Sequence, residues 1–213
     1  KKTSLLISSS PSGLLSSAIL GLMNPFVYYL ILLKAYKLLP AQVAQPLNMI
    51  WPIILVFLSA PILKQKIATR SYAALLISFL GVYIISSRGK LFSHNSADTL
   101  GVLLATGSSV FWALYFILNM RDKRDESVKL FLNFLFGSLY LAIAMTVTGN
   151  WPGMGIISLK GWVSAVYIGL FEMGLTFFFW LKALQLAPST DKVSNLVYLA
   201  PFLSLVFVNF IPH

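Results

Sequence analysis

The side chains that could do chemistry in this sequence are polar residues placed inside long apolar stretches. Glu172 is the sharpest case, because it stands in the middle of the run from Gly161 to Leu181, which holds no other acid. An ionised carboxylate at the centre of a bilayer costs about 2.5 to 3.5 kcal/mol, so we expect something to offset that cost. A proton carrier, a ligand for a substrate amine and a hydrogen-bonded structural glutamate all fit this position.

Amides, hydroxyls and aromatic rings recur at helical spacing along the other apolar segments, as expected for the wall of a solute pocket. The candidate binding or coupling residues are Asn24, Tyr28, Gln42, Gln45, Asn48, Trp51, Trp112, Tyr115, Glu172, Thr176, Asn195 and Tyr198. The candidate hinges are Pro25, Pro52 and Pro201. Close helix packing and static kinks are the alternatives, and packing explains Gly21 and Gly169 at least as well as a cavity does.

No catalytic constellation accompanies these residues. The chain has no cysteine, no HExxH helix and no P-loop, while His94 lies in a polar segment and His213 ends the sequence. We therefore predict neither an enzyme, nor a metal site, nor a cofactor. Lys192 stands at the start of the last apolar run, which is the wrong place for the Schiff-base lysine of a retinal protein.

The amino-acid composition indicates that these polar residues lie in a lipid bilayer. The 213 residues are 58% hydrophobic and 10% charged, with a mean hydropathy of +0.82, which is too apolar for one soluble core. We predict an all-α polytopic membrane bundle with seven spans. The expected spans are Leu14 to Leu33, Leu38 to Leu63, Ser71 to Ser87, Leu100 to Met120, Leu130 to Thr148, Gly161 to Leu181 and Val193 to Pro212.

The net charge of +10 comes from short breaks between the apolar runs, which argues against a nucleic-acid partner. If the spans alternate in direction, eleven of the 16 basic residues collect on one side, including Lys1, Arg70 and Lys192, and five collect on the other. The positive-inside rule then predicts that the Lys1 side is cytoplasmic.

An internal repeat joins the first expected span to the sixth. The segment from Gly21 to Pro40 matches the segment from Gly169 to Pro188 at an offset of 148, with seven of twenty positions identical. Spans five apart cross the membrane in opposite directions, so this is an inverted repeat, as found in secondary transporters. A chance match between leucine-rich spans is the alternative.

These segments carry a family resemblance. Three segments resemble the EamA-type transporters of the drug/metabolite transporter superfamily. They are GLMNPFVYYLILLKAYKLLPAQ from Gly21, GLFEMGLTFFFWLKALQLAPST from Gly169 and GVLLATGSSVFWALYFIL from Gly101. The resemblance implies ten helices in two inverted five-helix repeats. Residues 1–90 would belong to the first repeat and residues 91–213 to the second, so that this chain supplies helices three to nine and Lys1 is an interior position of a longer protein.

The function that the resemblance implies is secondary active transport of small organic metabolites such as amino acids. The protein would be an exporter in the bacterial plasma membrane, working by alternating access, and coupling to a proton or another ion stays open. A channel and a seven-span receptor are the alternatives. The expected partners are the lipid bilayer and a small-molecule substrate.

Overall fold

The computed structural model describes residues 10–86, 98–151, 157–200 and 203, and all elements in this part of the chain are helices. The expected all-α class is therefore confirmed for the described residues. The elements are α2 (Pro11–Gly21), η1 (Leu22–Val27), α3 (Tyr28–Leu38), α4 (Ala41–Asn48), α5 (Trp51–Ile62), α6 (Thr69–Ser86), α7 (Thr99–Arg121), α8 (Glu126–Thr148), α9 (Leu159–Tyr167), η2 (Ile168–Thr176), α10 (Phe177–Leu186) and α11 (Thr190–Val197).

Five continuous helical stretches are long and apolar enough to cross a membrane, and they agree with the first, second, fourth, fifth and sixth expected spans. They are Pro11–Leu38, Ala41–Ile62, Thr99–Arg121, Glu126–Thr148 and Leu159–Leu186. The third expected span is the shorter apolar helix Thr69–Ile84. Most of the seventh, including Pro201, lies outside the described residues, so the number of seven spans stays a prediction.

The first two spans are each interrupted close to a proline. Asn24 leaves the helical conformation (φ −148°, ψ 121°) directly before Pro25. In the second span, α4 ends at Asn48 and α5 begins at Trp51. Proline has no N–H to donate and clashes with the preceding turn, so it interrupts the ladder of helical hydrogen bonds at both points.

The chain divides into two compact units, and each combines segments from both expected repeats. Unit 1 comprises residues 1–26 and 122–186, and unit 2 comprises residues 27–121 and 187–213. This grouping follows spatial contacts, whereas the boundary near residue 90 follows the repeat, and that boundary stays a prediction.

Unit 1 is built on the crossing of α2 and α8. At the crossing, a Cβ added to Gly21 would lie 2.3 Å from the backbone oxygen of Asn133, and one added to Gly137 would lie 2.6 Å from Cδ of Pro25. Two glycines therefore let the two backbones touch, which accounts for Gly21 by packing. Among the described residues, no atom lies within 4 Å of a Cβ added to Gly169, its repeat mate, so Gly169 needs another explanation.

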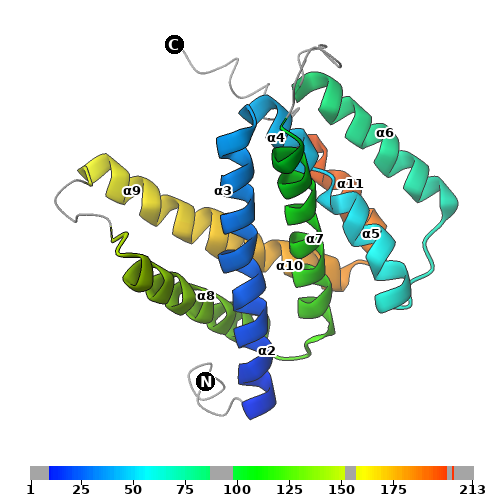
Figure 1. The fold of residues 1–213 in the computed structure, drawn as a ribbon. Coiled ribbons are helices and arrows are strands. Elements are labelled where there is room, and N and C mark those ends of the chain that lie inside the picture. Colours follow the sequence, from blue (N-terminus) through cyan, green and yellow to red (C-terminus); the bar gives the residue numbers. More distant parts are fainter. Residues whose placement is uncertain (1–9, 87–97, 152–156, 201–202, 204–213) are drawn as a thin grey trace. The chain divides into compact units, whose positions relative to one another are not determined.

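Unit 2 is built around α7, against which α3, α4 and α5 pack, while α11 packs on α5 and α6 (Figure 1). One part of its core joins Ala35, Ala44 and Ala105, where small side chains let α3, α4 and α7 approach closely. A second part, which joins α5, α6 and the end of α11, contains Ile53, Val56, Leu75, Val82 and Tyr198.

Candidate functional site

Unit 2 brings four of the predicted site residues together in one cluster. Tyr28 begins α3, Asn48 ends α4, Trp51 begins α5 and Trp112 lies near the middle of α7. We call these four residues and Ser108 the aromatic–amide cluster. The interruption of the second span lies between two of its members, Asn48 at the end of α4 and Trp51 at the start of α5.

Hydrogen bonds fix the polar members of the cluster. Tyr28 Oη donates to Asn48 Oδ1 at 3.3 Å, and Asn48 Nδ2 donates to Ser108 Oγ at 2.9 Å. Ser108 Oγ donates in turn to the carbonyl oxygen of Ala105 at 2.7 Å. All three polar side chains are buried, so the chain of donors and acceptors also sets which way the amide of Asn48 faces.

Aromatic rings form the other wall of the cluster. The ring of Trp112 lies 4.6 Å from that of Tyr28 and 5.9 Å from that of Trp51, with interplanar angles of 50° and 54°. Phe116 continues the stack one turn further along α7 at 5.6 Å. Tilted rings at these separations are favourable contacts, and their faces can hold an apolar or cationic group of a solute.

The interruption before Pro52 releases two backbone carbonyls, and the structure satisfies both. The carbonyl oxygen of Asn48 accepts from Ser109 Oγ at 2.8 Å, and that of Met49 accepts from Tyr198 Oη at 3.1 Å. Side chains from other segments therefore stabilise the interruption before Pro52, which explains it as a structural feature. The role of Pro52 as a moving hinge stays a prediction.

The other candidates of unit 2 lie apart from the cluster. Gln42 and Gln45 are exposed on α4, whereas Asn48 at its end is buried. Tyr115 is fully buried, and its carbonyl oxygen accepts from Asn119 Nδ2 at 2.8 Å. Asn195 Oδ1 accepts from Ser78 Oγ at 3.3 Å, which ties α11 to α6.

Unit 1 holds the remaining candidates, Asn24, Glu172 and Thr176. Asn24 is fully buried, and neither polar atom of its amide has a hydrogen-bond partner among the described residues. An unsatisfied buried amide costs about 1–3 kcal/mol, and the role of Asn24 in substrate binding or coupling stays a prediction. Glu172 and Thr176 are exposed on the stretch Leu159–Leu186, and Thr176 Oγ1 donates back to the carbonyl of Phe171 at 2.8 Å.

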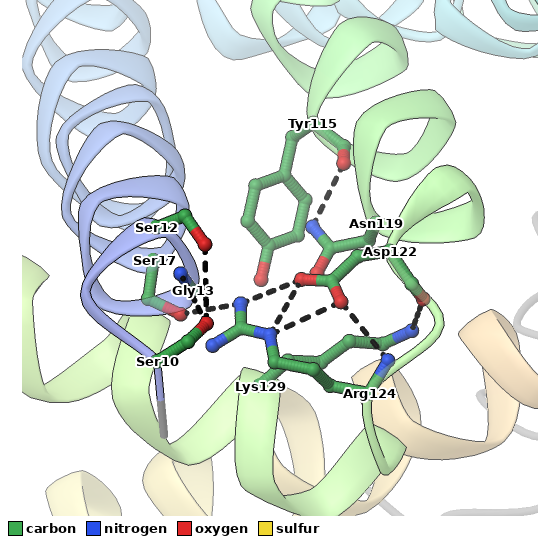
Figure 2. Close-up of polar contacts among 9 residues, drawn as sticks. All are labelled: Ser10, Ser12, Gly13, Ser17, Tyr115, Asn119, Asp122, Arg124 and Lys129. Carbon is green, nitrogen blue, oxygen red and sulfur yellow. Dashed lines mark hydrogen bonds and ion pairs between the residues drawn. The ribbon is translucent and has the colours of Figure 1, made fainter.

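A charged cluster at the start of α8 was missed by the sequence analysis, which counted these residues only as loop charges. Figure 2 shows that the guanidinium of Arg124 donates hydrogen bonds to both carboxylate oxygens of Asp122. Its Nη2 also donates to Ser17 Oγ of α2 at 2.9 Å. Lys129 Nζ donates to the carbonyl oxygen of Asp122 at 2.7 Å. The charged residues Asp122, Arg124 and Lys129 stand close together in the sequence. Their contact with α2, however, depends on the fold and could not be predicted from that spacing.

The ion pair between Asp122 and Arg124 gives this cluster a structural role. Burial by itself would raise the pKa of Asp122, but hydrogen bonds and charge from Arg124 outweigh it and hold that pKa below its usual value. Asp122 is therefore ionised at neutral pH. Its ion pair connects the loop before α8 to α2 through Ser17.

Five long apolar helices, two of them interrupted, define a polytopic helical membrane protein with a buried polar and aromatic cluster. Residues 1–87 and 99–212 match the EamA-like transporter family. The chain belongs to this family, and its long apolar helices are those of an integral membrane protein.

Named relatives agree with that assignment. The chain is 28% identical over 149 residues to an uncharacterized transporter of Clostridium kluyveri, a match that covers 68% of this chain and 47% of the relative. It is 23% identical over 192 residues to the aromatic amino acid exporter YddG of Ancylobacter novellus, covering 88% and 64%. The chain thus spans about half to two thirds of the length of the curated relatives it matches.

A solved crystal structure superposes with a TM-score of 0.74 at 20% sequence identity, covering 96% of this chain and 71% of the other. A likeness at this identity shows the shared fold.

Proposed function

We propose that the protein is a secondary active exporter of small organic metabolites such as amino acids, and that the aromatic–amide cluster is part of its substrate site. The observation that carries the proposal is the meeting of two interrupted helices at this cluster. Discontinuous helices form the substrate sites of many secondary transporters, because their ends offer polar groups in the middle of the membrane. The exporter named among the relatives acts on aromatic amino acids, which the stacked rings would suit.

Alternating access between inverted repeats is the mechanism that we propose. Its support is that the interruptions recur at the repeat offset. Shifted by 148, η1 (Leu22–Val27) falls within η2 (Ile168–Thr176), and shifted by 149, α4 (Ala41–Asn48) coincides with α11 (Thr190–Val197). The one-residue change in offset agrees with the match between Pro52 and Pro201. Alternating access between inverted repeats needs equivalent hinges in both repeats, and interruptions at matching positions would provide them.

The test is transport by everted membrane vesicles that carry the full-length protein. We expect accumulation of one or more radiolabelled amino acids, with L-phenylalanine and L-leucine as first probes, and collapse of the gradient on adding a protonophore. Trp112→Ala should lower the flux at least about tenfold, since it removes the ring that stacks with both Tyr28 and Trp51. Trp162→Ala is the matched control, because Trp162 is exposed on α9.

Two results would count against the proposal. Wild-type flux in the Trp112→Ala variant would remove the cluster from the substrate path. Single-channel currents would assign the protein to the channels instead. Proton coupling through Glu172 has its own test: the Glu172→Gln variant should lose the dependence of flux on the pH gradient, and an unchanged dependence would exclude Glu172 as the proton carrier.

A further inference from the structure

A second polar site lies in unit 2, away from the aromatic–amide cluster. It is a cavity of about 310 Å³ lined by Arg70, Ser71, Ala74, Asp191, Lys192 and Asn195. Arg70 and Ser71 belong to the first turn of α6, and Asp191 and Lys192 belong to the first turn of α11. We call it the α6–α11 cavity.

The position of the α6–α11 cavity along the chain predicts that it lies at a membrane surface. The expected spans begin at Ser71 and at Val193, so we expect both helix starts to lie where headgroups meet hydrocarbon. Ala74 and Asn195 lie about one turn deeper along the same two helices. The cavity therefore extends from the level of the headgroups towards the acyl chains, on the side that the distribution of basic residues predicts to be cytoplasmic.

The charges of the cavity have both signs. Arg70 and Lys192 are exposed, and within the described part of the chain neither forms an ion pair. Asp191 is only 4% exposed and receives hydrogen bonds from the hydroxyls of Ser189 and Ser71. Burial alone would raise the pKa of Asp191, but these hydrogen bonds outweigh it and lower the pKa, so the carboxylate is ionised at neutral pH.

The carboxylate of Asp191 also keeps acceptor capacity for a ligand. Two oxygens offer about four lone-pair sites, and the two hydroxyls and one backbone N–H occupy three of them, so about one acceptor site remains on a carboxylate that lines the cavity. Asn195 is oriented as well, since its Oδ1 accepts from Ser78, which leaves the NH₂ group of its amide as a donor. The wall thus combines two cations, one fixed anion and one amide.

We propose that the α6–α11 cavity binds a zwitterion that carries an ammonium group close to a phosphate, as in the headgroup of phosphatidylethanolamine. The phosphate contacts Arg70 and Lys192 at the rim, and the ammonium group donates to Asp191. A simple anion would satisfy the cations but would meet the carboxylate, whereas the zwitterion matches both signs. Free phosphoethanolamine has the same chemistry and is the soluble alternative source. This site is independent of the proposed substrate cluster.

The experiment is native mass spectrometry of the detergent-purified full-length protein, titrated with lipids that share their acyl chains and differ in headgroup. Phosphatidylcholine replaces the N–H donors by methyl groups, and phosphatidylglycerol replaces the ammonium group by hydroxyls. One charge-assisted hydrogen bond changes an affinity about ten- to hundredfold. We expect phosphatidylethanolamine to bind at least about tenfold more tightly than phosphatidylcholine.

Variants separate the two halves of the recognition. Asp191→Asn keeps the local hydrogen bonding but removes the charge, so the preference for phosphatidylethanolamine over phosphatidylcholine should disappear. Arg70→Gln should weaken both lipids. Lys66→Gln is the matched control, because it removes one positive charge from the loop before α6 and does not line the cavity. Circular dichroism melting of each variant confirms that it is folded.

Each outcome decides the proposal. A preference that survives in Asp191→Asn would overturn it, as would tighter binding of phosphatidylglycerol, which would indicate a plain anion site. Displacement of the lipid by phosphoethanolamine, lost in both variants, would support the zwitterion site and assign it to the soluble ligand. Transport assays do not enter this test, so its failure would leave the proposed function untouched.

Discussion

Replacing Gly21 by alanine tests how α2 and α8 are packed. A Cβ at this position would lie 2.3 Å from the backbone oxygen of Asn133 and 2.9 Å from the backbone nitrogen of Gly137, and backbone atoms cannot rotate away as a side chain can. The two helices would have to separate until the 2.3 Å contact exceeds about 3.0 Å. Overpacking costs about 1–3 kcal/mol, and a clash with backbone atoms belongs at the upper end, so about 2 kcal/mol remains after the gain of up to about 1 kcal/mol from replacing a helical glycine by alanine.

The assay is thermal unfolding of the purified protein in detergent, followed by tryptophan fluorescence. For a protein of this size 1 kcal/mol corresponds to about 2–4 °C, so we expect Gly21→Ala to lower the Tm by about 4–8 °C. Gly169→Ala is the matched control, because Gly169 occupies the equivalent position of the repeat and a Cβ there meets nothing within 4 Å. Equal Tm values for Gly21→Ala and the unmodified protein would refute the close crossing.

Two further predictions concern buried polar contacts. Ser109→Ala should lower the free energy of unfolding by about 0.6–2 kcal/mol, measured by the same melting assay, because it leaves the carbonyl of Asn48 without its partner; no change would mean that the kink needs no support. The lowered pKa of Asp122 contributes stability that is full above the unfolded value of about 3.9 and is lost as the pH falls through the folded value. The Tm of the unmodified protein should therefore fall when the pH is lowered below about 4. The Asp122→Asn variant lacks the charge that binds Arg124, so it should be less stable at pH 7 and should lack this part of the acid dependence.

Much of the fold could be predicted because membrane spans are a local property of the sequence. A run of about 20 apolar residues must satisfy its own backbone hydrogen bonds in lipid, so its length and hydropathy determine a helix without reference to the rest of the chain. The second and fourth spans show this, since Ala41–Ile62 and Thr99–Arg121 fall within a few residues of the expected bounds. The family assignment likewise followed from patterns that are visible in the linear sequence.

The candidate site was predictable by residue type but not by partner. Helical spacing placed Gln42, Gln45 and Asn48 roughly on one face, yet only Asn48 is buried. All three lie in α4, and spacing within one helix does not show that only its last residue meets partners on α3 and α7, where Asn48 bonds Tyr28 and Ser108.

What the sequence determined by itself is therefore that this chain is a helical membrane protein of the EamA-like transporter family, with polar residues inside its spans. Only the tertiary structure decided which of them meet. Asn48 finds Tyr28 and Ser108 across separations of 20 and 60 residues, and Asp191 comes to face Arg70 across the α6–α11 cavity. The physical reason is that apolar burial in lipid acts on each segment separately, whereas a buried hydrogen bond or a paired charge depends on the exact approach of segments that are distant along the chain.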